Sequence, residues 1–224
     1  RMRTQFTSPI DGVNLNQVYP GDKNGSFTQR LAHQIFNEVV SKADALIDCH
    51  GGDLNEDLRG FVVASKGPDE GINKVSLEMA SCYPCELVHV FPAESPGMSN
   101  SAQVIYGIPC IMPESGTPVP MREADVRFHV DGMLNVLKFF GVIEGKPQRR
   151  DQYISPERLR LRSEHNGIWY PQVILDQKVC KGDLIGVVSD LTGEELQPVK
   201  APKAGIVSMM RSHYSVRKDE MLLI

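Results

Sequence analysis

Short apolar runs that end at polar residues and glycine alternate along this chain with segments of helical periodicity, and this alternation restricts the fold most. Residues 43–52 read ADALIDCHGG and residues 107–116 read GIPCIMPESG. Runs of this kind are typical of strands that are covered on both faces of a sheet. Residues 26–41 and 124–140 instead repeat apolar side chains at helical spacing. The pattern predicts an α/β fold with a mostly parallel or mixed sheet flanked by helices.

The same reasoning predicts further elements and places two candidate residues. Residues 74–85 indicate a helix and residues 87–91 a strand, and Thr28 lies near a plausible cap of the first helix. Ligands of such sheets bind beyond the carboxyl ends of the strands. His50 and Glu114 both occupy that position.

The composition of the sequence changes at residues 144–156, which are polar and indicate a linker. Beyond it the helical period disappears, and strand-like runs separated by Gly, Asp and Pro occupy residues 167–171, 172–175, 183–188 and 205–209. We therefore expect an α/β domain over residues 1–150 and a small β-rich domain over residues 158–224.

Composition excludes several classes of function. The net charge is -4, from 24 basic and 28 acidic side chains, which argues against a dedicated nucleic-acid binder. No apolar run approaches the ~20 residues that a membrane span needs. The five cysteines are scattered and odd in number, which favours a reducing compartment, so we expect a cytoplasmic protein. The close pair Cys82 and Cys85 lacks the context of a zinc or redox motif and indicates plain thiols.

His50 is the first candidate for chemistry. It ends a predicted strand and precedes Gly51 and Gly52, which would let a ligand or backbone approach closely, so it could bind zinc. It could equally be a hydrogen-bonded histidine in a tight turn. Asp48 points the same way along the strand and could orient the imidazole of His50.

Glu114 and the segment 8–22 supply further candidates. A carboxylate at the end of an apolar strand can be partly desolvated, which raises its pKa toward the range of a general base, although a solvated loop glutamate is the alternative. Residues 8–22 are rich in Asp, Asn, Gly and Pro, which indicates a structured loop. Within it, Asn16 and Gln17 could present amides to a polar substrate.

Three motifs in this order carry a resemblance: S-P-x-D-G-x-N-L-N-x-x-x-P-G from Ser8, A-D-A-L-I-D-x-H-G-G from Ala43, and G-I-P-x-I-x-x-E-S-G from Gly107. Together they resemble the succinylglutamate desuccinylase/aspartoacylase family, a branch of the zinc carboxypeptidase-like hydrolases. The resemblance covers nearly the whole chain. It implies a zinc-dependent hydrolase that cleaves the amide bond of an N-acyl amino acid or a related small N-acyl compound.

The resemblance also implies roles for single residues. One zinc ion would be held by a His and a Glu of an upstream H-x-x-E motif and by a later histidine, which His50 matches. Glu114 matches the glutamate that activates water, and Asn16 matches a substrate-contacting asparagine. Gln17 stands where the family has an arginine, so a guanidinium that would bind a substrate carboxylate is absent there.

No H-x-x-E precedes His50, so two of the three zinc ligands are not present in this chain. We therefore expect the zinc-hydrolase-like domain over residues 1–150 to be incomplete at its N-terminus. The alternative is a catalytically inactive homologue that uses the cleft for binding or regulation. The expected partner is a small substrate resembling an N-acyl amino acid, with no nucleic acid or membrane, and a homo-oligomer is left open.

The C-terminal region adds a second, weaker resemblance. The pattern V-x-K-G-D over residues 179–183 is similar to half-repeats of biotinyl and lipoyl domains, which predicts a barrel-sandwich-like domain over residues 158–224. No pattern marks a modified lysine, so a structural or lid-forming role is favoured over a cofactor carrier.

Overall fold

The computed structural model of the chain describes residues 6–117, 122–155 and 157–224. It divides into two compact units, one formed by the residues up to His50 with Gly60–Glu114 and Glu123–Glu157. The other unit is formed by Gly51–Arg59, Ser115–Arg122 and Arg158–Ile224. Two short segments inside the predicted 1–150 domain therefore make most of their contacts with the C-terminal unit.

Five strands of an eight-stranded sheet lie wholly or partly in the first unit, in the order β1–β4–β2–β3–β5. Their bounds are β1 (Leu46–Ile47), β2 (Glu56–Lys66), β3 (Leu87–Pro92), β4 (Cys110–Gly116) and β5 (Tyr153–Ser155). The pairs β1 with β4, β2 with β3, and β3 with β5 are parallel. The early part of β2 belongs to the second unit and pairs there with an antiparallel strand. The predicted α/β class with a mixed sheet is thus confirmed.

Three helices of this unit match predicted segments with shifted ends, and its other helical segments were not predicted. Their bounds are η1 (Leu15–Val18), α1 (Phe27–Glu38), η2 (Val40–Lys42), α2 (Glu70–Ser81), α3 (Met98–Tyr106) and α4 (Glu123–Phe139). α1 begins with a capping box in which Ser26 and Gln29 bond each other's backbone, so the cap is Ser26, two residues before Thr28. α2 begins earlier than predicted because Asp69 caps it.

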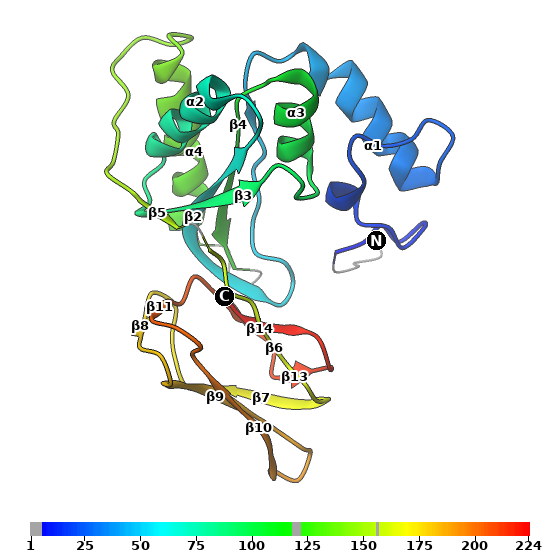
Figure 1. Cartoon of the computed structure of the whole chain (residues 1–224), viewed down its shortest axis with the longest axis vertical. Coiled ribbons are helices and arrows are strands. Elements are labelled where there is room, and N and C mark those ends of the chain that lie inside the picture. Colours follow the sequence, from blue (N-terminus) through cyan, green and yellow to red (C-terminus); the bar gives the residue numbers. More distant parts are fainter. Residues whose placement is uncertain (1–5, 118–121, 156) are drawn as a thin grey trace. The chain divides into compact units, whose positions relative to one another are not determined.

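Two apolar clusters hold these elements together. One joins α2 and α4 to the sheet and includes Val62, Met79, Ile111 and Phe128. The other joins α1 and α3 to β4 and includes Phe36, Ala102 and Cys110. In Figure 1, α2 and α4 lie to the left of β4, and α3 and α1 lie to its right. Adjacent residues of β4 thus contact different helices, as alternation along a strand requires.

Two strand predictions need correction. The apolar run 43–52 forms only the short β1, and residues 172–175 are not a strand. The long β2 has no counterpart among the predicted strands. Its first half, with Glu56, Asp57 and Arg59, has the composition of a loop, and it is a strand because β12 pairs with it at Met209–Arg211.

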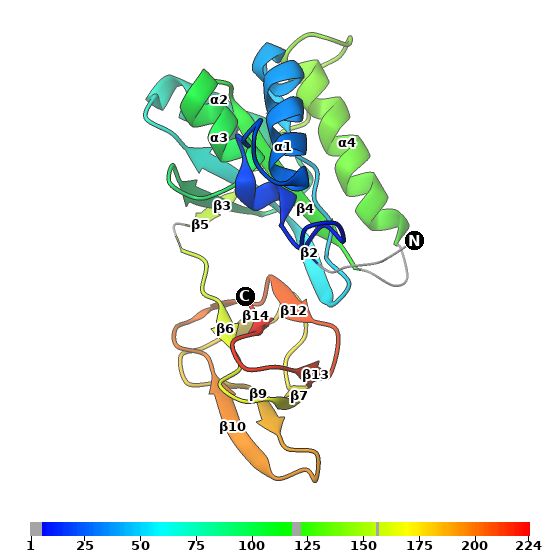
Figure 2. The same ribbon diagram turned by 90° about the vertical axis from the view of Figure 1, so that its right-hand side faces the viewer.

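The second unit is built of short antiparallel pairs (Figure 2). A four-stranded sheet has the order β10–β9–β7–β13, and β8 pairs with β11. Trp169, which is 1% exposed, lies in the core of this unit with Ile185, Val188 and Leu222. The bounds are β6 (Leu161–Arg162), β7 (Gly167–Pro171), β8 (Lys178–Val179), β9 (Leu184–Ser189), β10 (Glu195–Lys200), β11 (Gly205–Ile206), β12 (Met209–Arg211), β13 (Ser215–Val216) and β14 (Met221–Leu223).

Within the described residues, no helix combines the length and the apolar character that crossing a membrane requires.

Candidate functional site

His50 and Glu114 lie side by side on neighbouring segments of the first unit. After β1 the chain continues along β4: the Asp48 N–H donates to the Ile111 carbonyl at 2.9 Å and the His50 N–H donates to the Pro113 carbonyl at 3.0 Å. His50 and Glu114 then form an isolated parallel bridge. Glu114 is part of β4, which continues to Gly116, so it lies near the end of a strand and not in a loop.

Asp48 contacts the imidazole of His50, which it was predicted to orient. Its Oδ1 lies 3.4 Å from His50 Nε2, and the Asp48 side chain is 11% exposed against 30% for His50. A carboxylate on one ring nitrogen fixes the orientation of the ring and leaves the other nitrogen for a ligand. With Nε2 facing Asp48, that nitrogen is Nδ1. Asp48 Oδ2 is buried and has no hydrogen-bond partner among the described residues.

The charge of Asp48 acts on the groups around it. Burial by itself would lower the pKa of His50, but the hydrogen bond and charge of Asp48, with the charge of Glu114, raise this pKa above its ordinary value. Burial and then the charge of Asp48 raise the pKa of Tyr19 and of Cys110. The two carboxylates of Asp48 and Glu114 thus favour the charged form of the His50 imidazole.

The described residues do not by themselves fit a complete zinc site. Among them, no group of three or more His, Cys, Asp and Glu side chains could hold a metal ion. Catalytic zinc needs about three protein ligands. His33, the one histidine before His50, is followed by Gln34 and shares a hydrogen bond with Asn37 inside α1. We therefore derive no catalytic step through a metal, and the role of His50 as a ligand stays a prediction.

Asn16 and Gln17 have different environments. Asn16 lies in η1, where its N–H donates to Oδ1 of the cap residue Asn14 at 2.9 Å. Its own Oδ1 accepts the backbone N–H of Met98, the first residue of α3, at 2.9 Å. Gln17 is exposed, and its side chain makes no hydrogen bond within the described residues. The structure thus holds Asn16 and leaves Gln17 free.

Asp11 is a residue whose part in the site the sequence analysis missed. Its carboxylate accepts hydrogen bonds from the hydroxyls of Ser26 and Thr28 and from the Thr28 N–H, each at 2.7 Å. These bonds, those from Thr28 first, hold the pKa of Asp11 well below its usual range. They tie the segment that carries Asn16 to the start of α1. The sequence feature that could have indicated these bonds is the Asp-Gly pair followed by hydroxyl residues at the start of a helix.

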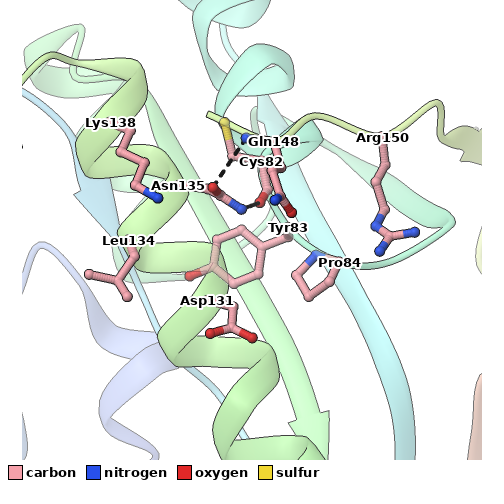
Figure 3. Close-up of a pocket in the computed structure, with 9 residues that line it drawn as sticks. All are labelled: Cys82, Tyr83, Pro84, Asp131, Leu134, Asn135, Lys138, Gln148 and Arg150. Carbon is pink, nitrogen blue, oxygen red and sulfur yellow. Dashed lines mark hydrogen bonds between the residues drawn. The ribbon is translucent and has the colours of Figure 1, made fainter. Parts of the chain in front are cut away.

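A pocket of about 350 Å³ lies elsewhere in the first unit, between the C-terminal end of α2, one face of α4 and residues 148–150 (Figure 3). Asn135 donates to the Cys82 carbonyl and accepts the Gln148 N–H, each at 3.2 Å. Neither His50 nor Glu114 lines it. Its lining residues are Cys82, Tyr83, Pro84, Asp131, Leu134, Asn135, Lys138, Gln148 and Arg150.

The α/β fold with a histidine and a glutamate at adjoining strand ends defines a class of hydrolase-like domains, and comparison with known proteins identifies the family. The model of the succinylglutamate desuccinylase/aspartoacylase catalytic domain matches residues 4–140, more than half of the chain. The chain belongs to the succinylglutamate desuccinylase/aspartoacylase family.

Individual relatives agree with this assignment. The N-alpha-acetyl-L-2,4-diaminobutyric acid deacetylase of Halomonas elongata is 26% identical over 97% of this chain. The chain spans 66% of the length of that relative. Two structures share the fold, each with 24% identity, a TM-score of 0.87, and coverage of 97% of this chain and 68% of the other. They are a succinylglutamate desuccinylase from Silicibacter sp. TM1040 and the product-bound ectoine utilization protein EutE (DoeB) from Ruegeria pomeroyi.

Proposed function

We propose that this chain is the larger part of a zinc-dependent deacylase that hydrolyses the amide bond of an N-acyl amino acid or a related small N-acyl compound. The observation that carries the proposal is the pairing of His50 with Glu114 at adjoining strand ends, next to Asp48. Membership of a family of desuccinylases and aspartoacylases supports it. So does the likeness to a deacetylase of an N-acetyl amino acid.

Four of the predicted site residues have a role in this proposal. His50 would be one zinc ligand, and Asp48 would orient its imidazole; the two further ligands are not present in this chain. When bound, zinc supplies a Lewis acid that polarises the amide carbonyl and lowers the pKa of water. Glu114 takes a proton from the attacking water and passes it to the leaving amine. Asn16 donates a hydrogen bond to a substrate oxygen.

Amine release by the full-length gene product tests the reaction, with N-succinyl-L-glutamate and N-acetyl-L-2,4-diaminobutyrate as substrates. Because loss of a general base costs about 100- to 10,000-fold, Glu114→Gln is expected to lower kcat by that factor with little change in KM. Glu86→Gln is the matched control, because Glu86 is exposed and precedes β3. It is expected to leave kcat unchanged. Equal activity of the two variants would contradict the role of Glu114.

Zinc content is measured on the same protein. His50→Ala is expected to lower bound zinc, whereas the exposed His213 can be replaced by alanine without effect. A full-length product that holds no zinc and hydrolyses neither compound would overturn the proposal.

A catalytically inactive homologue that uses this site for binding or regulation is the second candidate. The neutral, exposed Gln17 in place of an arginine supports it. Binding of either compound without amine release would favour this candidate. The cytoplasmic location and a homo-oligomeric state stay predictions.

A further inference from the structure

The first turn of α3 holds the segment that carries Asn16 at two points. The Met98 N–H donates to Asn16 Oδ1 at 2.9 Å, and the Ser101 hydroxyl donates to the Tyr19 carbonyl at 3.3 Å. The first N–H groups of a helix have no partner within the helix. Gly97, at the cap position of α3, has no side chain to accept them. Asn16 therefore caps α3 from a segment 82 residues away.

This contact decides which end of the Asn16 amide is available. A backbone N–H can only donate, so the atom that faces Met98 must be the amide oxygen. The Nδ2 group carries two hydrogens and has no hydrogen-bond partner within the described residues. Asn16 thus presents a donor and keeps its acceptor occupied.

The opposite side of α3 is fixed by buried polar side chains. Asn100 and Gln103, which are 4% and 3% exposed, both contact Ser65 near the end of β2. The Ser65 hydroxyl donates to Asn100 Oδ1, and Gln103 Nε2 donates to the Ser65 carbonyl at 2.9 Å and to Asn73 Oδ1 at 2.7 Å. Asn100 Nδ2 donates to the Ser95 carbonyl at 2.9 Å. Because unpaired buried polar groups are costly, this arrangement resists rotation or sliding of α3.

We propose that Ser101 is a positioning residue for substrate recognition. With the Met98 amide it holds residues 16–19 on the fixed helix α3, so that Asn16 Nδ2 is kept as a hydrogen-bond donor toward a carboxylate or carbonyl oxygen of the substrate. The contact of Asn16 with a substrate, and the identity of that substrate, rest on the proposed function. The docking of residues 16–19 on α3 does not.

Hydrogen exchange of the Met98 amide tests the docking directly, in the full-length protein without substrate. Loss of one hydrogen bond, as in Ser101→Ala, is expected to speed this exchange about 3- to 10-fold. Ser99→Ala is the matched control, because Ser99 is buried on the same turn and its hydroxyl makes no hydrogen bond within the described residues. Ser101→Thr keeps the hydroxyl and should restore slow exchange. Equal exchange in the two alanine variants would overturn the docking.

Steady-state kinetics with N-acetyl-L-2,4-diaminobutyrate and N-succinyl-L-glutamate test the consequence for recognition. Ser101→Ala is expected to raise KM by about 3- to 10-fold with kcat nearly constant, because the donor is misplaced and the proton transfer is not. Ser101→Thr should restore KM. Faster exchange at Met98 with an unchanged KM would overturn the positioning role. Absence of activity in the wild type would instead count against the proposed function, and the exchange result would still decide the docking.

Discussion

At the scale of single residues, Asn16 shows how one amide can serve both the fold and the site. Its oxygen accepts the first N–H of α3, and its nitrogen is free to donate. The sequence placed Asn16 in a structured loop but could not show which end of the amide is occupied. That depends on Met98, which is distant in the chain. In the proposed function, recognition of the substrate by Asn16 therefore depends on the start of α3.

Asn16→Asp separates these two functions. An aspartate keeps an oxygen for the Met98 N–H, and a negative charge at a helix N-terminus is favourable, so we expect the melting temperature to be retained. The donor is replaced by a charged acceptor, which should weaken binding of a substrate carboxylate by about tenfold or more, or about 1.4 kcal/mol. Asn16→Ala removes the cap as well and should cost about 0.5–2 kcal/mol of stability. Thermal unfolding and KM measure both effects, and an unchanged KM in Asn16→Asp would contradict the donor role.

The two glycines after His50 are equivalent in the sequence and not in the structure. A Cβ on Gly52 would lie 2.5 Å from the Glu56 carbonyl oxygen and 2.6 Å from that of Gly116, and neither backbone atom can move aside. A Cβ on Gly51 would meet only the Ser115 carbonyl oxygen, at 3.6 Å. We expect Gly52→Ala to lower the free energy of unfolding by about 1–3 kcal/mol, as overpacking does. Gly51→Ala, the matched control, should stay within about 0.5 kcal/mol in chemical denaturation. Equal losses would be inconsistent with this packing.

At the scale of elements, the sequence predicted those helices and strands whose apolar residues follow a regular spacing. The helix at Glu123–Phe139 and the strand at Leu87–Pro92 were found close to their observed bounds. α3 was not predicted, because Asn100 and Gln103 on its buried face are polar. Their partners lie on other elements, so no local pattern marks them.

Asp11 ties the segment before η1 to α1, and this tie depends on pH. The pKa of Asp11 is lower in the folded protein than in the unfolded chain, so the folded state binds fewer protons there and gains stability above the unfolded value, about 3.9. That gain is lost as pH falls below 4 toward the folded pKa. We expect Asp11→Asn to lower the melting temperature at pH 7 and the difference from wild type to shrink at pH 3.

The control for Asp11 is Asp22→Asn. Asp22 is exposed, and its carboxylate accepts only the Asn24 N–H within the described residues, at 2.8 Å. Asp22→Asn should therefore leave the melting temperature nearly unchanged at both pH 7 and pH 3. A constant difference between Asp11→Asn and wild type from pH 7 to pH 3 would exclude the ionised carboxylate as the cause.

At the scale of the whole molecule, the prediction of the fold was more complete than that of the site. His50 and Glu114 could be paired because both follow apolar runs of one predicted sheet, and adjoining parallel segments bring them together. The α/β class follows from the alternation of apolar runs and helical periodicity, and the family follows from three ordered motifs. The metal site could not be completed from the sequence, because His50 is the one residue of this chain that matches the expected ligands.

Five buried polar side chains of β2, α2 and α3 form hydrogen bonds with one another, and these bonds limit how the sequence can vary among species. Each of the five side chains has a partner within the set, so replacing any one by an apolar residue leaves a buried group unpaired. Tolerated changes must therefore come in compensating groups, and an alignment of close homologues should show these positions covarying. The positions are Ser65, Asn73, Ser76, Asn100 and Gln103.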